Sequence, residues 1–265
     1  MIRVLVAGAA GRMGREVVKA VAGDENLQLA GAVDFNHLGQ DAGTLAGVGE
    51  LGVVVTRDLA QTIKDTQAQV VVDFTNPDAV LDNIKTILNS GAFPVVGTTG
   101  LDQKDLDEID QLARAKGLGC LVAPNFAIGA ILMMKFAAQA AKYMPHVEII
   151  ELHHDQKLDA PSGTALKTAE AIMKVRESFR QGHFNEFEKI PGSRGGDYEG
   201  MRIHSVRLPG YVAHQEVIFG GLGQSLVIRH DSISRESFMP GVVLACNKIL
   251  DYKGVVYGLE HLIAE

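Results

Sequence analysis

The first half of the chain alternates between short apolar runs and longer stretches in which apolar residues recur at helical spacing. Valine-rich runs of this kind are typical of strands that are buried on both faces of a parallel sheet. The alternation therefore predicts a doubly wound α/β domain built from βαβ units. The expected strands are 3–7, 27–33, 53–55, 70–74, 93–96 and 119–122, and the expected helices follow the first strand and lie near 58–66, 77–90 and 102–117.

The second half of the chain has a different pattern. Residues 129–143 are apolar nearly all round, which predicts a buried helix. Residues 147–152 alternate as a strand does, and a helix is expected from Ala165 to about Phe179. Alternating segments at 202–207, 216–219 and 226–229, with a turn at 220–223, predict antiparallel strands joined by hairpins and mark a second domain.

Two further segments complete this pattern. Residues 181–201 are polar and glycine-rich and predict a long loop, of a length that often serves function or partner binding. Residues 240–250 are apolar on one side and predict a helix that returns to the first domain.

A glycine-rich turn follows the first expected strand. Gly8, Gly11 and Gly14 have the spacing GxxGxxG, one residue looser than the GxGxxG fingerprint of dinucleotide-binding folds, so a plain glycine-rich turn is an alternative. Asp34 ends the second expected strand, about 20 residues past the last glycine, where an acidic side chain accepts hydrogen bonds from ribose hydroxyls. The two features together predict a nicotinamide dinucleotide site.

The residues after Asp34 bear on the choice between NADH and NADPH. Phe35, Asn36 and His37 include no arginine or lysine to pair with a 2′-phosphate, which favours NADH. Arg12, in the glycine turn, is within reach of a phosphate and blurs this preference.

Small and polar residues follow three further expected strands, at 73–75, 97–100 and 123–126. Ligands of doubly wound sheets bind beyond the carboxyl ends of the strands, where small residues let a nicotinamide ring approach the backbone. Ordinary turn chemistry explains each segment equally well by itself. Three of them in register with the glycine turn favour a cofactor site.

The densest chemistry lies at His153, His154 and Lys157, on a strand-to-helix connection. The helix start at Gly163-Thr164 offers backbone N–H groups that suit a carboxylate or phosphate. A cationic triplet beside such a helix end indicates an acidic substrate. The alternative is a solvated polar loop with one capping serine; the lysine, the glycine and the cofactor motif favour a functional site.

Composition and charge exclude several classes of protein. The formal charge of −7 argues against nonspecific nucleic-acid binding. No apolar run reaches the ~18 residues of a membrane span, and the N-terminus enters a strand without a signal-peptide pattern, so we expect no membrane partner and a cytoplasmic location. Cys120 and Cys246 lie in apolar segments without metal-ligand spacing, so we expect them to be buried and expect no metal site.

Over nearly its whole length the chain resembles the 4-hydroxy-tetrahydrodipicolinate reductase family, the dihydrodipicolinate reductases of bacterial lysine and diaminopimelate biosynthesis. The likeness rests on VAGAAGRMG at 6–14, DFT at 73–75, GTTG at 97–100, APNFAIG at 123–129 and ELHHDQKLDAPSGTA at 151–165. It implies a Rossmann-like dinucleotide-binding domain of residues 1–126 and 236–265. It also implies an α+β substrate-binding domain of residues 127–235 with a mixed sheet, through which the chain forms a homotetramer.

The resemblance also implies a role for individual residues. His153 is the implied catalytic acid/base and Lys157 a proton donor, while His154 binds the substrate and the backbone amides of Gly163 and Thr164 hold a substrate carboxylate. The implied cofactor-binding residues are Gly8, Ala9, Ala10, Gly11, Arg12, Met13, Asp34, Gly97, Thr98, Thr99, Ala123, Pro124, Asn125 and Phe126. Family members that use NADPH well carry a basic residue where Phe35 stands, so the resemblance implies dual or NADH-leaning cofactor use.

The implied reaction is hydride transfer from NADH or NADPH to a cyclic imine of the dihydrodipicolinate type, a small dicarboxylate. Hydride leaves negative charge on the ring that must be protonated, and an imidazole is an acid suited to neutral pH. A lysine beside a bound carboxylate stabilises that charge and can donate a proton. Because cofactor and substrate are assigned to different domains, we expect closure about hinges near 125–129 and 235–240.

Two rival functions remain at this point. Another two-domain NAD(P)-dependent dehydrogenase, for an aldehyde or a sugar, would share the first half of the chain but lack the segment from His153 to Thr164. A noncatalytic sensor of nicotinamide redox state would keep the fold without turnover, and the intact His153 and Lys157 speak against it.

Overall fold

The computed structural model describes residues 1–263 and divides the chain into two compact units. The first unit comprises Met1–Ile128 together with the chain from Arg235 onward, and the second comprises Gly129–Ser234. The chain therefore passes between the units twice, at 128–129 and at 234–235. No helix among residues 1–263 is long and apolar enough to cross a membrane.

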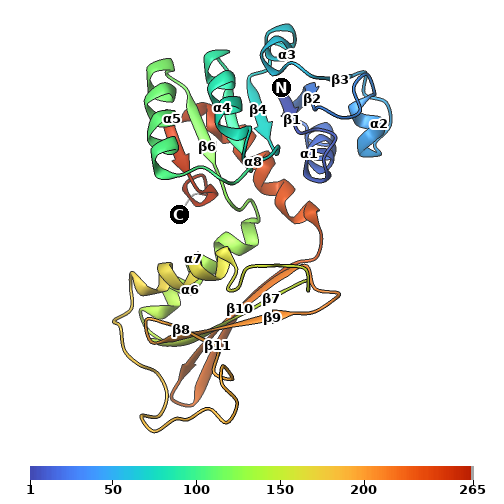
Figure 1. The fold of residues 1–265 in the computed structure, drawn as a ribbon. Helices are drawn as coiled ribbons and strands as arrows, with labels where there is room; N and C mark the ends of the chain where they lie inside the picture. Colours follow the sequence, from blue (N-terminus) through green and yellow to red (C-terminus); the bar gives the residue numbers. More distant parts are fainter. Residues whose placement is uncertain (264–265) are drawn as a thin grey trace. The chain divides into compact units, whose positions relative to one another are not determined.

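The first unit contains a seven-stranded sheet in the order β12-β6-β5-β4-β1-β2-β3, and every pair in it is parallel (Figure 1). β4 and β6 are buried along their whole length, as apolar strands covered on both faces must be. The strands are β1 Ile2–Ala7, β2 Leu27–Val33, β3 Val55–Thr56, β4 Val70–Asp73, β5 Phe93–Val96, β6 Gly119–Val122 and β12 Gly254–Tyr257. β1 pairs with β2 on one side and β4 on the other, so the strand order reverses at β1, which is where such sheets bind ligands.

The helices of the first unit form two layers. α1 packs against α2 and α8, and α4 packs between α3 and α5. Asp41, Asp58 and Asp102 accept backbone hydrogen bonds at the N-termini of α2, α3 and α5, which fixes where these helices begin. The helices are α1 Arg12–Ala22, α2 Ala42–Ala46, α3 Leu59–Thr66, α4 Val80–Asn89, α5 Gln103–Lys116 and α8 Met239–Lys248.

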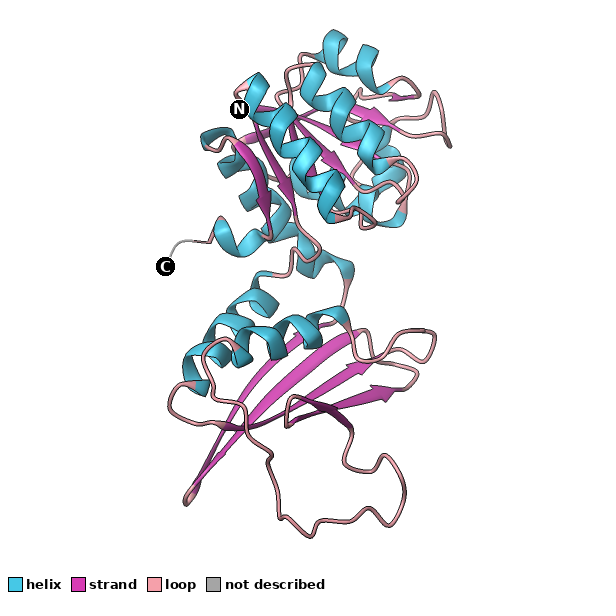
Figure 2. Cartoon of the chain, turned by 60° about the vertical axis from the view of Figure 1, so that its left-hand side comes forward, coloured by secondary structure: helices cyan, strands magenta, loops and turns pink. Residues whose placement is uncertain are grey.

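The second unit contains a five-stranded mixed sheet in the order β11-β10-β7-β9-β8, and two helices cover one of its faces (Figure 2). β7 and β9 are parallel, and the other neighbours are antiparallel. Its elements are α6 Ile128–Ala141, β7 His146–His153, α7 Gly163–Met173, β8 Gly196–Tyr198, β9 Met201–Arg207, β10 Ala213–Gly221 and β11 Gln224–Ser232. Val147 and Ile149 point toward α6 and α7 and form the core of this unit with Val217 and Phe219.

The structure corrects several expectations about the elements. α7 ends at Met173 rather than near Phe179, because the buried Arg176 donates hydrogen bonds to Pro145 and Gln181 and the chain turns there. The mixed sheet that the resemblance implies is confirmed, because β7 and β9 are parallel and α7 lies on the crossover between them. β9 forms no hairpin with β10, because β7 lies between them in the sheet. Only Val55 of the expected strand 53–55 belongs to β3.

Short elements were missed in the sequence. The elements without an expected counterpart are α2, β8, β12 and the 3₁₀ helices Arg235–Phe238 and Leu259–His261. The expected helix 240–250 is α8, followed by the 3₁₀ helix Ile249–Asp251. The expected loop at 181–201 is confirmed as far as residue 195, after which β8 and β9 begin. Cys120 and Cys246 are buried, as expected, and burial raises the pKa of both thiols.

Candidate functional site

The turn after β1 requires glycine at two of its positions. Gly8 has a φ of +79°, and a Cβ atom on it would lie 2.4 Å from the carbonyl oxygen of Phe74. A Cβ atom on Gly14 would lie 2.0 Å from the carbonyl oxygen of Gly8, so α1 could not pack as closely on the turn. The N–H groups of Gly8 and Ala9 both donate to the carbonyl oxygen of Val33. The expected strand–turn–helix arrangement is therefore present.

Asp34 links this turn to the end of β2. Its Oδ2 accepts a hydrogen bond of 3.0 Å from the backbone N–H of Ala10, and its Oδ1 accepts one of 2.9 Å from that of Asn36. A carboxylate oxygen can accept more than one hydrogen bond, so both oxygens keep capacity for ribose hydroxyls.

A cavity of about 250 Å³ opens where β1, β2 and β4 end. Gly8, Gly11 and Asp34 line it, together with Phe74 and Thr75. Three of the implied cofactor-binding residues thus meet two residues of the segment 73–75 at one edge of the sheet. Ala9, Ala10, Arg12 and Met13 belong to the same turn or to the start of α1 but are not part of the cavity lining.

Arg57 also lines this cavity and was missed in the sequence. Its guanidinium carbon lies 5.3 Å from the centre of the Phe35 ring, in a cation–π arrangement. Arg57 follows β3, which is the parallel neighbour of β2. Residues that follow neighbouring parallel strands meet at the same edge of a sheet, and this rule was the available signal. The segment Phe35 to His37 itself contains no arginine or lysine, but Arg57 brings a cation to it from another part of the chain.

A buried carboxylate joins the ends of β4 and β5. Asp73 accepts hydrogen bonds of 2.8 Å from the hydroxyls of Thr75 and Thr98 and from the amide of Asn83. The Thr98 hydroxyl is thereby engaged, and the side chains of Ala123 and Phe126 are buried. These residues can therefore meet a cofactor mainly through their backbone, whereas Thr99 is exposed.

Gly97 and Asn125 shape the same edge. A Cβ atom on Gly97 would lie 2.1 Å from the Phe74 ring, which itself packs against Phe126 at 5.7 Å between ring centres. The Asn125 side chain accepts a hydrogen bond from the backbone N–H of Ala127, and Pro124 is exposed. The structure thus explains Gly97 and Asn125 by the fold, without reference to a ligand.

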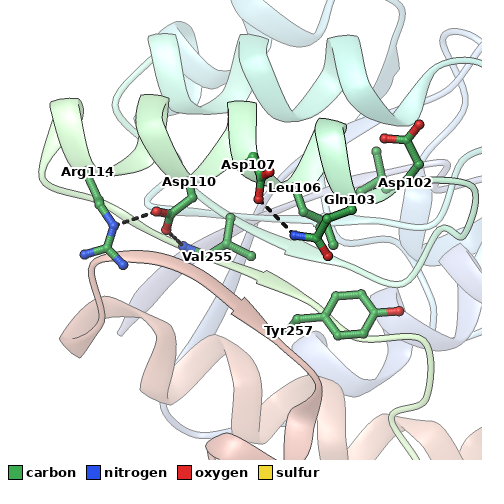
Figure 3. Close-up of a pocket in the computed structure, with 9 residues that line it drawn as sticks. Asp102, Gln103, Leu106, Asp107, Asp110, Arg114, Val255 and Tyr257 are labelled. Atoms are coloured by element: carbon green, nitrogen blue, oxygen red, sulfur yellow. Dashed lines mark hydrogen bonds and ion pairs between the residues drawn. The ribbon is translucent and has the colours of Figure 1, made fainter.

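A larger cavity of about 550 Å³ lies between α5 and β12 (Figure 3). Its polar side chains bond to one another: Gln103 donates to Asp107, and Arg114 donates to Asp110. Asp110 also accepts from the backbone of Val255, and the hydrogen bonds from Arg114 and Val255 lower its pKa. β6, β5 and β4 separate β12 from β1 in the sheet, so this cavity is distinct from the glycine turn.

In the second unit, the His153 imidazole is held by a buried carboxylate. His153 is the last residue of β7, and its Nδ1 lies 2.5 Å from Oε2 of Glu151. Glu151 has 0% exposure and receives two hydrogen bonds from Arg207, of 2.7 and 2.8 Å. Burial raises the pKa of the Glu151 carboxyl, but hydrogen bonds from His153, Arg207 and Ser205 outweigh burial and lower this pKa to about 2. Glu151 is therefore ionised at neutral pH.

The loop after β7 carries the other expected residues. The Lys157 amine lies 2.6 Å from the Asp159 carboxylate, and the Asp159 carbonyl oxygen accepts a hydrogen bond from Arg207. Lys157 and His153 are thus linked through Arg207 and Glu151, whereas His154 is exposed.

The N-terminus of α7 lies at the end of this loop. The Ser162 hydroxyl caps it by accepting from the backbone N–H of Ala165. Within residues 1–263 the Gly163 N–H has no acceptor, and a Cβ atom on Gly163 would meet no atom within 4 Å. Gly163 is therefore a glycine that the fold itself does not require, at an exposed helix start.

Comparison with known proteins gives the family. The model of the N-terminal part of dihydrodipicolinate reductase matches residues 2–126, and the model of its C-terminal part matches residues 129–263. The chain belongs to the dihydrodipicolinate reductase family. It is 59% identical to the 4-hydroxy-tetrahydrodipicolinate reductase of Desulfitobacterium hafniense over 99% of this chain and 98% of that protein. It is 56% identical to that of Syntrophomonas wolfei over 98% of both chains.

Solved structures agree with this assignment. A dipicolinate-bound dihydrodipicolinate reductase from Paenisporosarcina sp. TG-14 is similar with a TM-score of 0.90 and 48% identity, over 99% of this chain and 100% of that one. An amine dehydrogenase from Mycobacterium smegmatis reaches a TM-score of 0.70 at 17% identity, over 99% of this chain and 96% of that one, and shows the shared fold alone.

Family membership establishes the reaction. The chain is an NAD(P)H-dependent oxidoreductase with 4-hydroxy-tetrahydrodipicolinate reductase activity, in lysine and diaminopimelate biosynthesis. The rival interpretations as another dehydrogenase or a noncatalytic sensor are thereby set aside. Among residues 1–263, no three His, Cys, Asp or Glu side chains are grouped so as to hold a metal ion.

Proposed function

We propose that the loop between β7 and α7 binds a dicarboxylate ring and protonates it during reduction. The proposal rests chiefly on the His153 imidazole, which an ionised, buried Glu151 holds at the end of β7. Bound NAD(P)H supplies the hydride to the ring. His153 supplies the proton that the reduced ring needs, and Lys157 stabilises the developing negative charge and serves as a proton donor.

The substrate carboxylate is assigned to the start of α7. The exposed N–H of Gly163 and the partial positive charge of the helix end favour an anion there, and Thr164 belongs to the same first turn. His154 is exposed in the loop between β7 and α7 and is assigned a second contact to the substrate.

The cofactor is assigned to the carboxyl edge of the first unit's sheet. The tight approach of backbone at Gly8 and the cavity beside it fit a pyrophosphate and its adenosine, and Asp34 is assigned to the ribose hydroxyls. The segments 9–13, 97–99 and 123–126 are assigned to the rest of the cofactor. Asp34 favours NADH, while Arg57 offers a cation to a 2′-phosphate, so we propose that the enzyme uses both cofactors.

A homotetramer formed through the second unit is part of this proposal. The sheet face opposite α6 and α7 carries Ile218 and Val227 side by side, and Val227 is 51% exposed. Exposed apolar side chains on a helix-free sheet face favour burial against another copy. The cytoplasmic location and the closure about segments 125–129 and 235–240 stay predictions.

The catalytic assignment is tested by NADH and NADPH oxidation, with substrate made in situ from pyruvate and aspartate semialdehyde. We expect His153→Ala and Lys157→Ala each to lower kcat by a factor of about 10² or more, the usual scale for losing an acid or a charge stabiliser. Cofactor affinity should barely change. His204→Ala, which alters a histidine bound to Glu148 outside this loop, serves as the matched control. Near-normal turnover in both loop variants would refute the assignment.

A further inference from the structure

Glu151 is connected, directly or through Arg207, to three parts of the proposed substrate site. Its carboxylate accepts from His153 at the end of β7 and, at 3.2 Å, from the backbone N–H of Ser162, the residue that caps α7. It also receives the Arg207 guanidinium, whose Nη2 donates to the carbonyl oxygen of Asp159 as well. Asp159 in turn pairs with Lys157. One buried carboxylate therefore connects the imidazole, the helix start and the lysine loop.

These contacts fix the proton positions on His153. Every neighbour that bonds to Glu151 is a donor, so its carboxylate has no proton of its own to share. The Nδ1 atom of His153 must therefore carry a hydrogen in both charge states of the ring. Nε2 is then the atom that gains and loses the exchangeable proton.

We propose that Glu151, held by Arg207, is the positioning residue of the reductase reaction, because it keeps Nε2 of His153 as the proton-donating atom and aligns α7 and the Lys157 loop. The inference rests on the proposed role of His153 as the acid. Glu151 and Arg207 are far apart in sequence. Arg207 lies on β9 and contacts Glu151 because β7 and β9 pair in parallel.

Charged groups surround the contact between Glu151 and His153. Arg207 bonds to the Glu151 carboxylate and to the carbonyl oxygen of Asp159, whose own carboxylate pairs with Lys157. Gln215 on β10 lies opposite Glu151, and His230 on β11 lies opposite Gln215, so His230 is the titratable group on the far side of the same sheet face. At the N-terminus of α7, the residue that contacts Glu151 is Ser162, which carries no charge.

Glu151→Gln tests this inference, because it removes the charge at nearly constant volume. Its amide would donate to Nδ1 and place the neutral ring's hydrogen on Nε2, the opposite of the native arrangement. We expect kcat to fall on the order of 10²-fold. The ¹⁵N NMR signals of the neutral His153 ring should therefore change from those of the Nδ1–H tautomer to those of the Nε2–H tautomer. Glu151→Asp keeps the carboxylate and should keep the hydrogen on Nδ1, with a kcat loss of about 10-fold from poorer alignment.

Glu148→Gln is the matched control. Glu148 lies on the same strand and bonds to Arg194 at 2.6 Å and to His204 at 2.8 Å, so it forms a second Glu–Arg–His cluster away from the loop. This variant should leave the His153 tautomer unchanged, whereas a general effect of losing a Glu–Arg–His cluster would alter it.

The outcomes distinguish a failure of the Glu151 inference from a failure of the proposed role of His153. If His153→Ala is inactive while folded Glu151→Gln keeps both kcat and the Nδ1–H tautomer of His153, Glu151 has no positioning role. If His153→Ala itself turns over normally, the proposed substrate site is wrong, and the inferred role of Glu151 is wrong as well. Should Glu151→Gln fail to fold, Glu151→Asp decides, and a wild-type kcat in that variant overturns the inference.

Discussion

The carboxylate of Asp34 serves the fold as well as the proposed cofactor site. It accepts backbone hydrogen bonds from Ala10 and Asn36, so it sets the turn against which a pyrophosphate would lie. Replacing Asp34 with alanine, together with Phe35→Arg, is expected to reverse the preference between NADH and NADPH. The same change leaves the Ala10 N–H without its acceptor, and a loss of affinity for both cofactors would follow from that alone.

Arg57 gives a cleaner test of cofactor choice at the level of a single residue. Its guanidinium packs on Phe35 in the cavity and bonds to no carboxylate or carbonyl oxygen within residues 1–263. Arg57→Ala should raise the KM for NADPH about 10-fold, the scale of one charge-assisted hydrogen bond, and change the KM for NADH little. The difference should shrink as salt is raised, because phosphate contacts are screened.

Steady-state kinetics with both cofactors at fixed low salt decide between Arg57 and Arg12. A selective loss of NADPH use in Arg12→Ala, with Arg57→Ala unchanged, would assign the phosphate to the start of α1 instead. Equal losses for both cofactors in Arg57→Ala would mean that Arg57 only supports the Phe35 ring.

At the scale of elements, features that lie within one continuous segment could be predicted from the sequence, whereas contacts that depend on which strands pair could not. The strand–turn–helix at Gly8 and the loop with His153 and Lys157 are continuous segments, so their residue spacing is visible in the chain. Arg207 lies on β9 and Arg57 follows β3, so each reaches its site only because β9 pairs with β7 and β3 pairs with β2. The residue pattern around His153 or around Asp34 does not indicate these pairings. Short elements such as the five-residue α2 and the three-residue β8 lack enough residues to show a period.

The start of α7 is the element on which substrate binding is expected to depend. Gly163 is the first residue of the helix, a position that tolerates proline, and Ser162 before it is extended with a ψ of 152°, as a residue before proline must be. Gly163→Pro should therefore fold normally while it removes the N–H. We expect the substrate KM to rise about 10-fold or more, the cost of a lost hydrogen bond to a charged group.

Gly163→Ala controls for added side-chain atoms, because it keeps the N–H and its Cβ meets no protein atom within 4 Å. The KM of each variant is measured alongside its thermal unfolding. A wild-type KM in folded Gly163→Pro would place the substrate carboxylate elsewhere.

At the scale of the whole molecule, the first unit is completed by residues from the end of the chain. β12 pairs with β6, and Gly241 of α8 packs so closely on Phe126 that a Cβ atom would lie 2.0 Å from its carbonyl oxygen. The second unit is thus an insertion between β6 and α8, and the chain enters and leaves it once each. Substitutions on the helix-free face of its sheet can therefore change assembly without altering the core of the first unit.

Val227→Glu is expected to break the proposed tetramer for this reason. Val227 pairs with Ile218 across β10 and β11, and a carboxylate there would have to be buried without a partner if two copies met on this face. Val54→Glu is the matched control, because Val54 is similarly exposed, at 49%, but belongs to the first unit.

Light scattering after size exclusion should give a wild-type mass of about 114 kDa, four times the 28.4 kDa of the chain, and Val54→Glu should keep this mass. Val227→Glu should elute as a smaller species with unchanged helix and strand content. A wild-type protein that runs as a monomer would refute the tetramer, and a tetrameric Val227→Glu would move the interface to another face of the second unit.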